Sequence, residues 1–218
     1  MHALQGKTVL ITAGPTREPI DSVRYISNHS SGKMGYAIAR EAALRGARVT
    51  VVSGPVSIPA PEGCSVVYVQ TACEMEQAVL SRSTLSDIII CAAAVCDMRP
   101  KQVYDHKLKK AADAEALRTI EFVENPDILK QVGLSKKPGQ VVVGFAAETD
   151  DLIAHAQSKL ASKHADMIVA NDVSTGKVFG SDTNKAMFIT DAGIDDYPEM
   201  EKGQLACALL DKISTLLA

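Results

Sequence analysis

The sequence predicts a Rossmann-like α/β fold of three layers, in which a doubly wound, mostly parallel sheet lies between helices and carries an added flap. The first observation is a set of short, continuous apolar runs rich in β-branched residues, which are typical of strands buried on both faces. The second is that segments with helical spacing lie between several of these runs. Strands that alternate with helices favour a parallel sheet with helices on both faces.

The first half of the chain contains the clearest elements. Residues 8–13 form a predicted strand that stops at Gly14 and Pro15. Residues 34–44 are rich in Ala and have helical spacing, and Gly46 suits the position just after the helix end. Thr71 and Glu74 form a capping box, which predicts a helix to about residue 80. Three further strands are predicted at residues 48–52, 65–69 and 87–91.

The second half contains one long segment without a regular pattern. Residues 97–117 include Pro100 and many charges, so we expect a flexible flap there, because loops of this length are usually functional or disordered. Thr149 is expected to cap a helix to about His164, with Asp150 and Asp151 in its first turn. The other predictions are a helix with Pro126 at its first position that runs to Val132, strands at 119–123, 141–146, 166–170 and 186–190, a short strand near Ile194, and an amphipathic helix over 201–217.

Composition excludes several classes of protein. Hydrophobic residues make up 46% and charged residues 22% of the 218 residues, which is typical of a globular chain, and we expect one domain over residues 1–218. The net charge of −3 gives no field that would attract nucleic acid or an anionic membrane. The five cysteines form no CxxC pair, the five histidines form no metal-binding pair, and residues 1–7 lack a signal-peptide pattern. We therefore expect a cytoplasmic protein without a metal site built from its own side chains.

Four predicted strands end in polar or small residues. In open α/β sheets ligands bind beyond the carboxyl ends of the strands, so these four ends predict a site on one rim. Tight turns alone favour the same residue types and are the alternative. The four segments are residues 14–18, 91–97, 144–149 and 171–173.

Two further patterns suit anionic ligands. Ser30, Ser31 and Gly32 open the first helix, where free N–H groups and the helix dipole favour a phosphate, although a Ser N-cap without a ligand would have the same pattern. Lys107 to Lys110 place three lysines in the flap, where they could close over a triphosphate or form only a solvated basic stretch. Lys159 and Lys163 lie four residues apart on one helix face and could reach an anion together.

Two common nucleotide motifs are absent. A Walker A loop requires Gly at position 27 and Ser or Thr at position 34, which are Ser27 and Met34 here. A dinucleotide site requires a G-x-G-x-x-G turn after the first strand and an acidic residue after the second. The first strand leads instead into Gly14–Pro15, and no acidic residue follows the second. A hydride-transfer reaction is therefore disfavoured.

The chain resembles the bacterial phosphopantothenoylcysteine synthetases, also called phosphopantothenate–cysteine ligases, which form the ligase domain of the bifunctional coenzyme A biosynthesis protein. The shared motifs follow in order across nearly the whole chain, and the run over 28–35 is highly specific. They are ITAGPTRE (11–18), VRYISNHSSGKMG (23–35), AAAVCD (92–97), KLKK (107–110), NPDI (125–128), VGFAAET (143–149) and ANDV (170–173).

The resemblance implies a two-step ligase of coenzyme A biosynthesis. The carboxylate of 4′-phosphopantothenate attacks the α-phosphate of CTP, which gives an acyl-cytidylate and pyrophosphate. The amine of L-cysteine then displaces CMP and gives phosphopantothenoylcysteine. The family implies Mg²⁺ with the CTP, a homodimer, and a flavin-dependent decarboxylase that is often fused in front of the ligase.

The resemblance also implies residue roles. Asn28 would polarise the acyl carbonyl, Arg24 would support the same step, and Lys107 would contact the nucleotide and stabilise the transferring charge. Ser31 and Gly32, with Asn28, would bind phosphopantothenate. The implied nucleotide-binding set is Cys91, Ala92, Ala93, Asp97, Lys107, Pro126, Asp127, Ile128, Leu129, Phe145, Lys159 and Lys163.

Two other functions are compatible with the fold class. A Rossmann-type NAD(P)-dependent oxidoreductase would bind NADH tightly, although the motifs above disfavour it. A non-catalytic nucleotide-binding module would bind CTP and leave it intact when both co-substrates are present.

Overall fold

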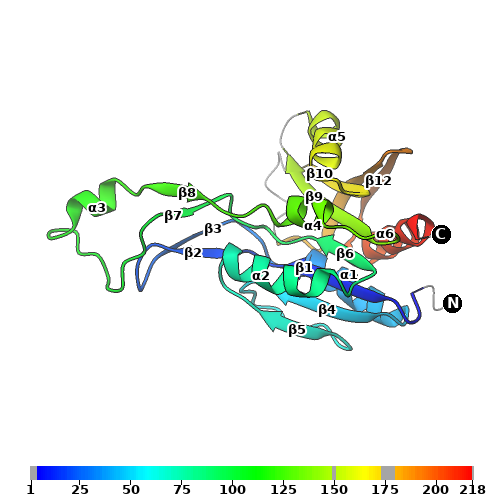
Figure 1. The fold of residues 1–218 in the computed structure, drawn as a ribbon, viewed down its shortest axis with the longest axis horizontal. Coiled ribbons are helices and arrows are strands. Elements are labelled where there is room, and N and C mark those ends of the chain that lie inside the picture. The colour runs from blue at the N-terminus through cyan, green and yellow to red at the C-terminus, as the bar shows by residue number, and fades with distance from the viewer. Residues whose placement is uncertain (1–3, 149–150, 173–179, 218) are drawn as a thin grey trace.

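The computed structural model describes residues 4–148, 151–172 and 180–217. Its centre is an eight-stranded sheet in the order β12-β11-β10-β9-β6-β1-β4-β5 (Figure 1). The six strands from β10 to β5 are parallel, and β11 and β12 continue the sheet in antiparallel pairing. The strands are β1 (Thr8–Ala13), β4 (Arg48–Ser53), β5 (Ser65–Tyr68), β6 (Ile88–Cys91), β9 (Val141–Glu148), β10 (Met167–Asp172), β11 (Thr183–Thr190) and β12 (Gly193–Glu201).

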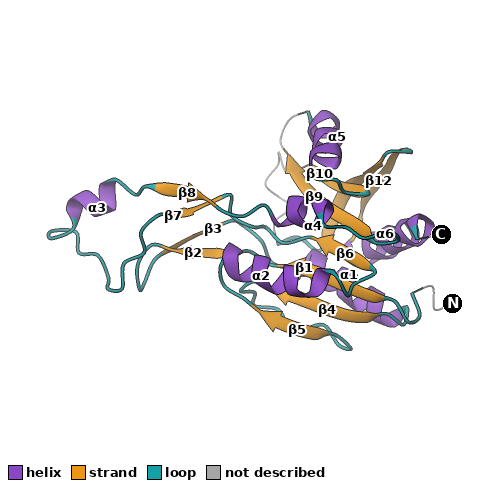
Figure 2. Cartoon of the chain, viewed as in Figure 1, coloured by secondary structure: helices purple, strands orange, loops and turns teal. Residues whose placement is uncertain are grey.

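Helices cover both faces of this sheet (Figure 2). On one face α1 (Lys33–Leu44) and α6 (Lys202–Leu216) pack against each other and against the sheet. On the other face lie α2 (Ala72–Ser83), α4 (Ile128–Leu134) and α5 (Leu152–Ser162). Each face buries its own apolar cluster, and most central strands contribute to both because their side chains alternate in direction. The predicted three-layer, mostly parallel Rossmann-like fold is therefore confirmed.

The order of the strands locates a switch point. From β1 the chain continues to β4 and β5 on one side, and then returns to β6, β9 and β10 on the other. Such a reversal leaves a crevice beyond the carboxyl ends of the two central strands, because the connections leave in opposite directions. In this chain the crevice lies beyond β1 and β6.

An arm projects from the body of the molecule at the same edge (Figure 1). We define the arm as residues 17–27 and 98–124. It contains the pairs β2 (Arg17–Pro19) with β3 (Tyr25–Ser27) and β7 (Met98–Pro100) with β8 (Phe122–Glu124), and the short helix α3 (Ala114–Arg118). The predicted flap over 97–117 is thus part of a larger arm that also has regular structure.

Several predicted helix starts differ from the structure. The helix predicted from Pro126 begins at Ile128, because the Asp127 side chain accepts the Lys130 N–H at 3.0 Å and so caps it one residue after the proline. The helix predicted to begin after Thr149 begins at Leu152, and Asp151, expected in the first turn, is its N-cap residue. Thr149 and Asp150 lie outside the described residues. The helix predicted over 34–44 begins at Lys33 and has Gly32 at its N-cap, so a Ser N-cap is not what opens it.

Other local predictions are confirmed. The capping box of Thr71 and Glu74 is formed at the start of α2, and Gly46 has a positive φ just after α1. The strand predicted at 119–123 is observed slightly later, as β8. Within the described ranges, every helix is too short or too polar to cross a bilayer.

Candidate active site

The larger cavity of the crevice has a volume of about 410 Å³. It lies beyond β1, β6 and β9, and α4, α5 and the base of the arm complete its walls. Every residue of the predicted nucleotide set except Ala92 and Lys107 lines it. These are Cys91, Ala93, Asp97, Pro126, Asp127, Ile128, Leu129, Phe145, Lys159 and Lys163.

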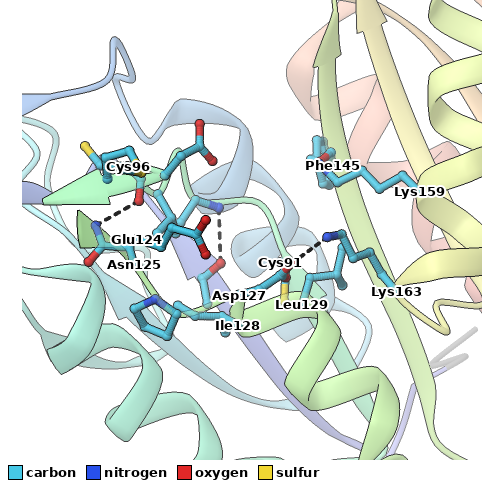
Figure 3. A pocket seen from close by; sticks show the side chains of 16 residues that line it. Cys91, Cys96, Glu124, Asn125, Asp127, Ile128, Leu129, Phe145, Lys159 and Lys163 are labelled. Atoms are coloured by element: carbon cyan, nitrogen blue, oxygen red, sulfur yellow. Dashed lines mark hydrogen bonds and ion pairs between the residues drawn. The ribbon is translucent and has the colours of Figure 1, made fainter. Parts of the chain in front are cut away.

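Charged groups face one another across this cavity. The Lys163 ammonium at the end of α5 lies 2.5 Å from Asp127 Oδ2 at the start of α4, and Figure 3 shows this contact. Burial is the largest single effect and favours the protonated acid. The hydrogen bonds from Lys163 and the Lys130 N–H, with the charges of Lys163 and Lys159, together outweigh it and lower the pKa of the Asp127 carboxyl. Lys159 Nζ donates to the Phe145 carbonyl oxygen at 2.9 Å. The wall formed by α5 and β9 is therefore cationic.

The opposite wall comes from the base of the arm. Figure 3 shows Cys96, Glu124 and Asn125 on this side, away from Phe145 and the two lysines. The Asn125 amide donates to the Cys96 carbonyl oxygen at 2.9 Å, and so joins the loop after β6 to the end of β8. The carboxylates of Asp97 and Glu124 also line the cavity. The site thus combines carboxylates on one wall with ammonium groups on the other.

Cys91 lies at the end of β6 in the wall of the larger cavity. Burial raises the pKa of its thiol to about 12, and the negative charge of Asp127 acts in the same direction. The thiol is therefore neutral at physiological pH. A neutral side chain at this place provides apolar surface rather than a nucleophile.

A smaller cavity of about 160 Å³ adjoins the first, and Ala93 and Phe145 line both. It opens at the N-terminus of α1, where Ser31 and Gly32 lie as the sequence predicted for a phosphate site. Gly32 has φ +75°, a conformation that side-chain-bearing residues rarely adopt. A Cβ there would also lie 2.7 Å from Val56 Cγ1, so glycine is required for the chain to enter α1 in this way.

None of the three predicted catalytic residues lines either of these two cavities. Asn28 is exposed, and its amide donates to the Val95 carbonyl oxygen at 3.0 Å, beside the larger cavity. Arg24 and Lys107 belong to the arm and line neither cavity. Arg24 donates to the Asp21 carboxylate and to the Leu108 carbonyl oxygen, while Lys107 is exposed next to Leu108. Within one chain, the structure brings most of the nucleotide set together, and it holds Arg24 and Lys107 near each other in the arm, outside both cavities.

Sequence reasoning missed part of the site. Lys33, Asn184 and Lys202 line the smaller cavity, and Glu124 and Asn125 line the larger one. Asn125 begins the NPDI motif, so its motif was a usable signal. Lys202 had no such signal, because a lysine at the start of an amphipathic helix is usually a surface residue.

Over the described ranges, no three His, Cys, Asp or Glu side chains are arranged to hold a metal ion. Magnesium is commonly bound by one or two carboxylates together with substrate phosphates. Asp97 and Glu124, in the wall of the larger cavity, are of the right chemical type for that role.

The chain matches known proteins over nearly all of its length. Residues 4–217 match the family model described as the DNA/pantothenate metabolism flavoprotein C-terminal domain. The coenzyme A biosynthesis bifunctional protein CoaBC of Vibrio cholerae is 49% identical over 96% of this chain and 53% of its own length. CoaBC of Bacillus subtilis is 49% identical over 98% of this chain and 52% of its own length. The chain thus spans about half the length of the curated relatives it matches.

Solved structures confirm the fold. The crystal structure of the C-terminal domain of a CoaBC protein has a TM-score of 0.85 and 40% identity, and the match covers 100% of this chain and 98% of that one. A Cab2 variant in complex with phosphopantothenate-cysteine has a TM-score of 0.76 and 17% identity, with coverage of 94% and 87%, and shares the fold. The chain belongs to the family of the DNA/pantothenate metabolism flavoprotein C-terminal domain.

Proposed function

We propose that the chain is a ligase that joins 4′-phosphopantothenate to L-cysteine with CTP, in coenzyme A biosynthesis. The observation that carries the proposal is the pair of adjoining cavities at the switch point. The larger one has the cationic wall of Lys159 and Lys163, and the smaller one has a helix N-terminus. Membership in a family whose relatives are named as coenzyme A biosynthesis proteins supports the same reaction.

In the first step, a carboxylate oxygen of phosphopantothenate attacks the α-phosphorus of CTP. The bond to the β-phosphate oxygen breaks, and pyrophosphate leaves. Lys159 and Lys163 in the larger cavity would hold the nucleotide and balance its negative charge, while Ser31 and Gly32 would bind the phosphate of phosphopantothenate. Mg²⁺ held by Asp97 and Glu124 would supply further charge neutralisation for the phosphates.

In the second step, the amine of cysteine attacks the acyl carbon and CMP leaves. An amide N–H aimed at the developing oxyanion is worth about 2.7–4 kcal/mol in comparable enzymes. Asn28 is suited to this role because its Nδ2 carries two hydrogens, and the Val95 carbonyl oxygen accepts only one of them. Cys91, whose thiol is neutral, takes no part as a nucleophile.

We also propose that the chain acts as a homodimer in the cytoplasm. The arm exposes apolar side chains that a monomer would leave in water, and Lys107 and Arg24 lie outside the cavities of their own chain. A second copy would cover this surface and complete the site. The exposed arm side chains are Val23, Tyr25, Met98, Val103 and Phe122.

A flavin-dependent decarboxylase, fused or separate, would consume the product. The curated relatives are bifunctional and about twice as long as this chain, which supports such a partner. Neither nucleic acid nor a membrane is proposed as a partner, because the net charge of −3 would attract neither.

The proposal is tested by release of pyrophosphate from CTP or ATP, with phosphopantothenate, cysteine and Mg²⁺ present. We expect release with CTP, and only when phosphopantothenate is also present. Release with ATP as well would retain the ligase and broaden its nucleotide specificity. CTP that binds and stays intact would instead identify a non-catalytic binding module.

A further inference from the structure

Two lysines hold one short segment against the smaller cavity. Lys33, the first residue of α1, donates to the Gly180 carbonyl oxygen at 2.8 Å and to Asp182 Oδ1 at 2.7 Å. Lys202, the first residue of α6, donates through Nζ to the carbonyl oxygens of Ser181 and Thr183. Lys33 thus contacts residues 180 and 182, and Lys202 contacts residues 181 and 183. Residues 180–183 are therefore fixed between the N-termini of two helices. Both lysines line the smaller cavity.

Stability alone does not explain a lysine at position 202. The residue is only 8% exposed, and among the described residues its ammonium group donates to backbone carbonyl oxygens and to no carboxylate. It also occupies the N-terminus of α6, where the helix dipole disfavours a cation. Burial lowers the pKa of Lys202, and the neighbouring charge of Lys33 lowers it further.

The charge balance of the smaller cavity favours an anion. Its described lining contains Lys33 and Lys202 and no carboxylate, whereas three carboxylates line the larger cavity beside two lysines. Asp182 is paired with Lys33, but its side chain is 87% exposed and does not line the cavity. The two ammonium groups lie near the N-terminus of α1, whose helix dipole also attracts negative charge. Both effects therefore favour the binding of an anion in this cavity.

A second, independent observation comes from Asn184. Its side chain lines the same cavity, is 3% exposed, and donates to Asn171 Oδ1 at 2.9 Å. Its own Oδ1 is buried and accepts no hydrogen bond from the described residues. A register shift interrupts the β11–β12 pairing directly after Asn184, and such bulges often redirect a side chain beside a site. A buried acceptor without a donor is unfavourable because it has lost its hydrogen bond to water, so a ligand hydroxyl would offset that cost.

We propose that Lys202 is a positioning residue for a phosphate-bearing substrate in the smaller cavity, and that Asn184 accepts a hydrogen bond from a hydroxyl of the same substrate. The inference rests on the proposed ligase, because both CTP and 4′-phosphopantothenate carry phosphate and hydroxyl groups. Lys202 fixes residues 180–183 together with Lys33 and supplies positive charge to the phosphate. The two substrates are distinguished by the test.

The test uses isothermal titration calorimetry with three ligands: pyrophosphate, CTP and 4′-phosphopantothenate. We expect Lys202→Met to weaken the binding of pyrophosphate and of one substrate by about 10- to 100-fold, because the variant loses both the positive charge and the contacts that fix residues 180–183. Lys202→Arg should restore most of the affinity. Lys212→Met is the matched control, because Lys212 lies on the same helix and its 2.7 Å ion pair with Asp195 is outside the cavity.

Asn184→Ala distinguishes the contact with a substrate hydroxyl from the role of Lys202 toward the phosphate. It should weaken the same substrate as Lys202→Met but not pyrophosphate, which carries no hydroxyl on carbon. If Lys202→Met does not fold, Lys202→Gln carries the same expectation. A cooperative melting transition shows that the variant is folded.

Two results would overturn the role of Lys202. One is a folded Lys202→Met variant that binds all three ligands as tightly as the natural chain. The other is a lower Tm with unchanged affinities, which is the result expected of a purely structural lysine. If the natural chain binds pyrophosphate but neither substrate, the proposed ligase fails while the pyrophosphate titrations still decide the role of Lys202. If it binds none of the three, both proposals fail.

Discussion

Arg24 and Leu108 lie 84 positions apart in the sequence, yet Arg24 Nη2 donates a hydrogen bond of 2.7 Å to the Leu108 carbonyl oxygen. The Leu108 N–H donates in turn to Asp21 Oδ2 at 3.1 Å, and Arg24 pairs with the same carboxylate. One buried carboxylate therefore joins the two halves of the arm. It also holds the KLKK segment, which contains Lys107, beside Arg24.

The first prediction concerns Asp21. Desolvation favours its protonated form. The backbone N–H groups of Val23, Arg24 and Leu108, together with the Arg24 side chain, outweigh this and hold the pKa of the carboxyl well below its usual range. Because the folded-state pKa is depressed, this stabilisation is complete above the unfolded value of about 3.9 and is lost as the pH falls below it. Asp21→Asn should therefore speed amide hydrogen exchange at Leu108 at pH 7. Asp105→Asn, at an exposed carboxylate, is the control, and equal exchange in both variants would contradict the prediction.

The second prediction concerns Lys107, which is exposed on the arm outside both cavities. Lys107→Gln should abolish normal turnover of CTP, whereas Lys101→Gln, in an exposed ion pair on the same arm, should not. If a second copy completes the site, mixing Lys107→Gln with Asn28→Asp should restore about a quarter of the activity. Random pairing gives half of the dimers one subunit of each variant. In each such dimer, one site combines the natural Asn28 of one subunit with the natural Lys107 of the other and is intact, while the second site lacks both. Normal kinetics of Lys107→Gln would make the KLKK segment a solvated loop.

The third prediction separates the two chemical steps at Asn28. Asn28→Asp should still release pyrophosphate from CTP and phosphopantothenate, but should transfer the acyl group to cysteine about 100- to 1,000-fold more slowly. The reason is that a carboxylate cannot donate to the developing oxyanion. Rapid quench with separation of the acyl-cytidylate measures both steps in one variant, so the first step serves as the control. Unchanged overall turnover would remove Asn28 from catalysis.

The fourth prediction concerns the reactivity of cysteine thiols. With a pKa of about 12, Cys91 should resist iodoacetamide at pH 8, because only the thiolate reacts. The exposed Cys73 should be labelled first, and Cys73→Ser should remove that signal. Peptide mass spectrometry measures both sites. Fast labelling of Cys91 would show that its thiol is neither buried nor neutral.

The fifth prediction tests the packing beneath the larger cavity. A Cβ at Gly133 of α4 would lie 1.9 Å from the Lys163 carbonyl oxygen, so Gly133→Ala must push α4 away from the end of α5. We expect a loss of about 1–3 kcal/mol in the free energy of unfolding. CTP affinity should also fall, because Asp127 and Lys163 would separate. Gly203→Ala in α6, with nothing within 4 Å of its Cβ, should not destabilise the chain. Thermal melts measure the stability of both variants, and titration measures their CTP affinity. Equal stability and affinity in the two variants would contradict the prediction.

The sequence alone determined the elements whose causes are local. Continuous β-branched runs predict buried parallel strands, because both faces of such strands meet helices, and β1, β4 and β6 follow that pattern. The capping box of Thr71 and Glu74 spans three residues and needs no tertiary contact. Motifs at strand ends placed most of the nucleotide set on one rim, because the carboxyl ends of parallel strands share an edge of the sheet.

Tertiary structure decided the remainder, because the causes lie far apart in the chain. Lys33 meets Asp182 across 149 positions, and Arg24 meets Leu108 across 84, so no local window could reveal either contact. Lys202 has the sequence context of a surface lysine, yet it is buried, and its ammonium group contacts residues 181 and 183 at the start of α6. Side-chain burial depends on what packs above a residue. The sequence therefore determined which residues could form a site, and the packing of distant segments determined which of them meet.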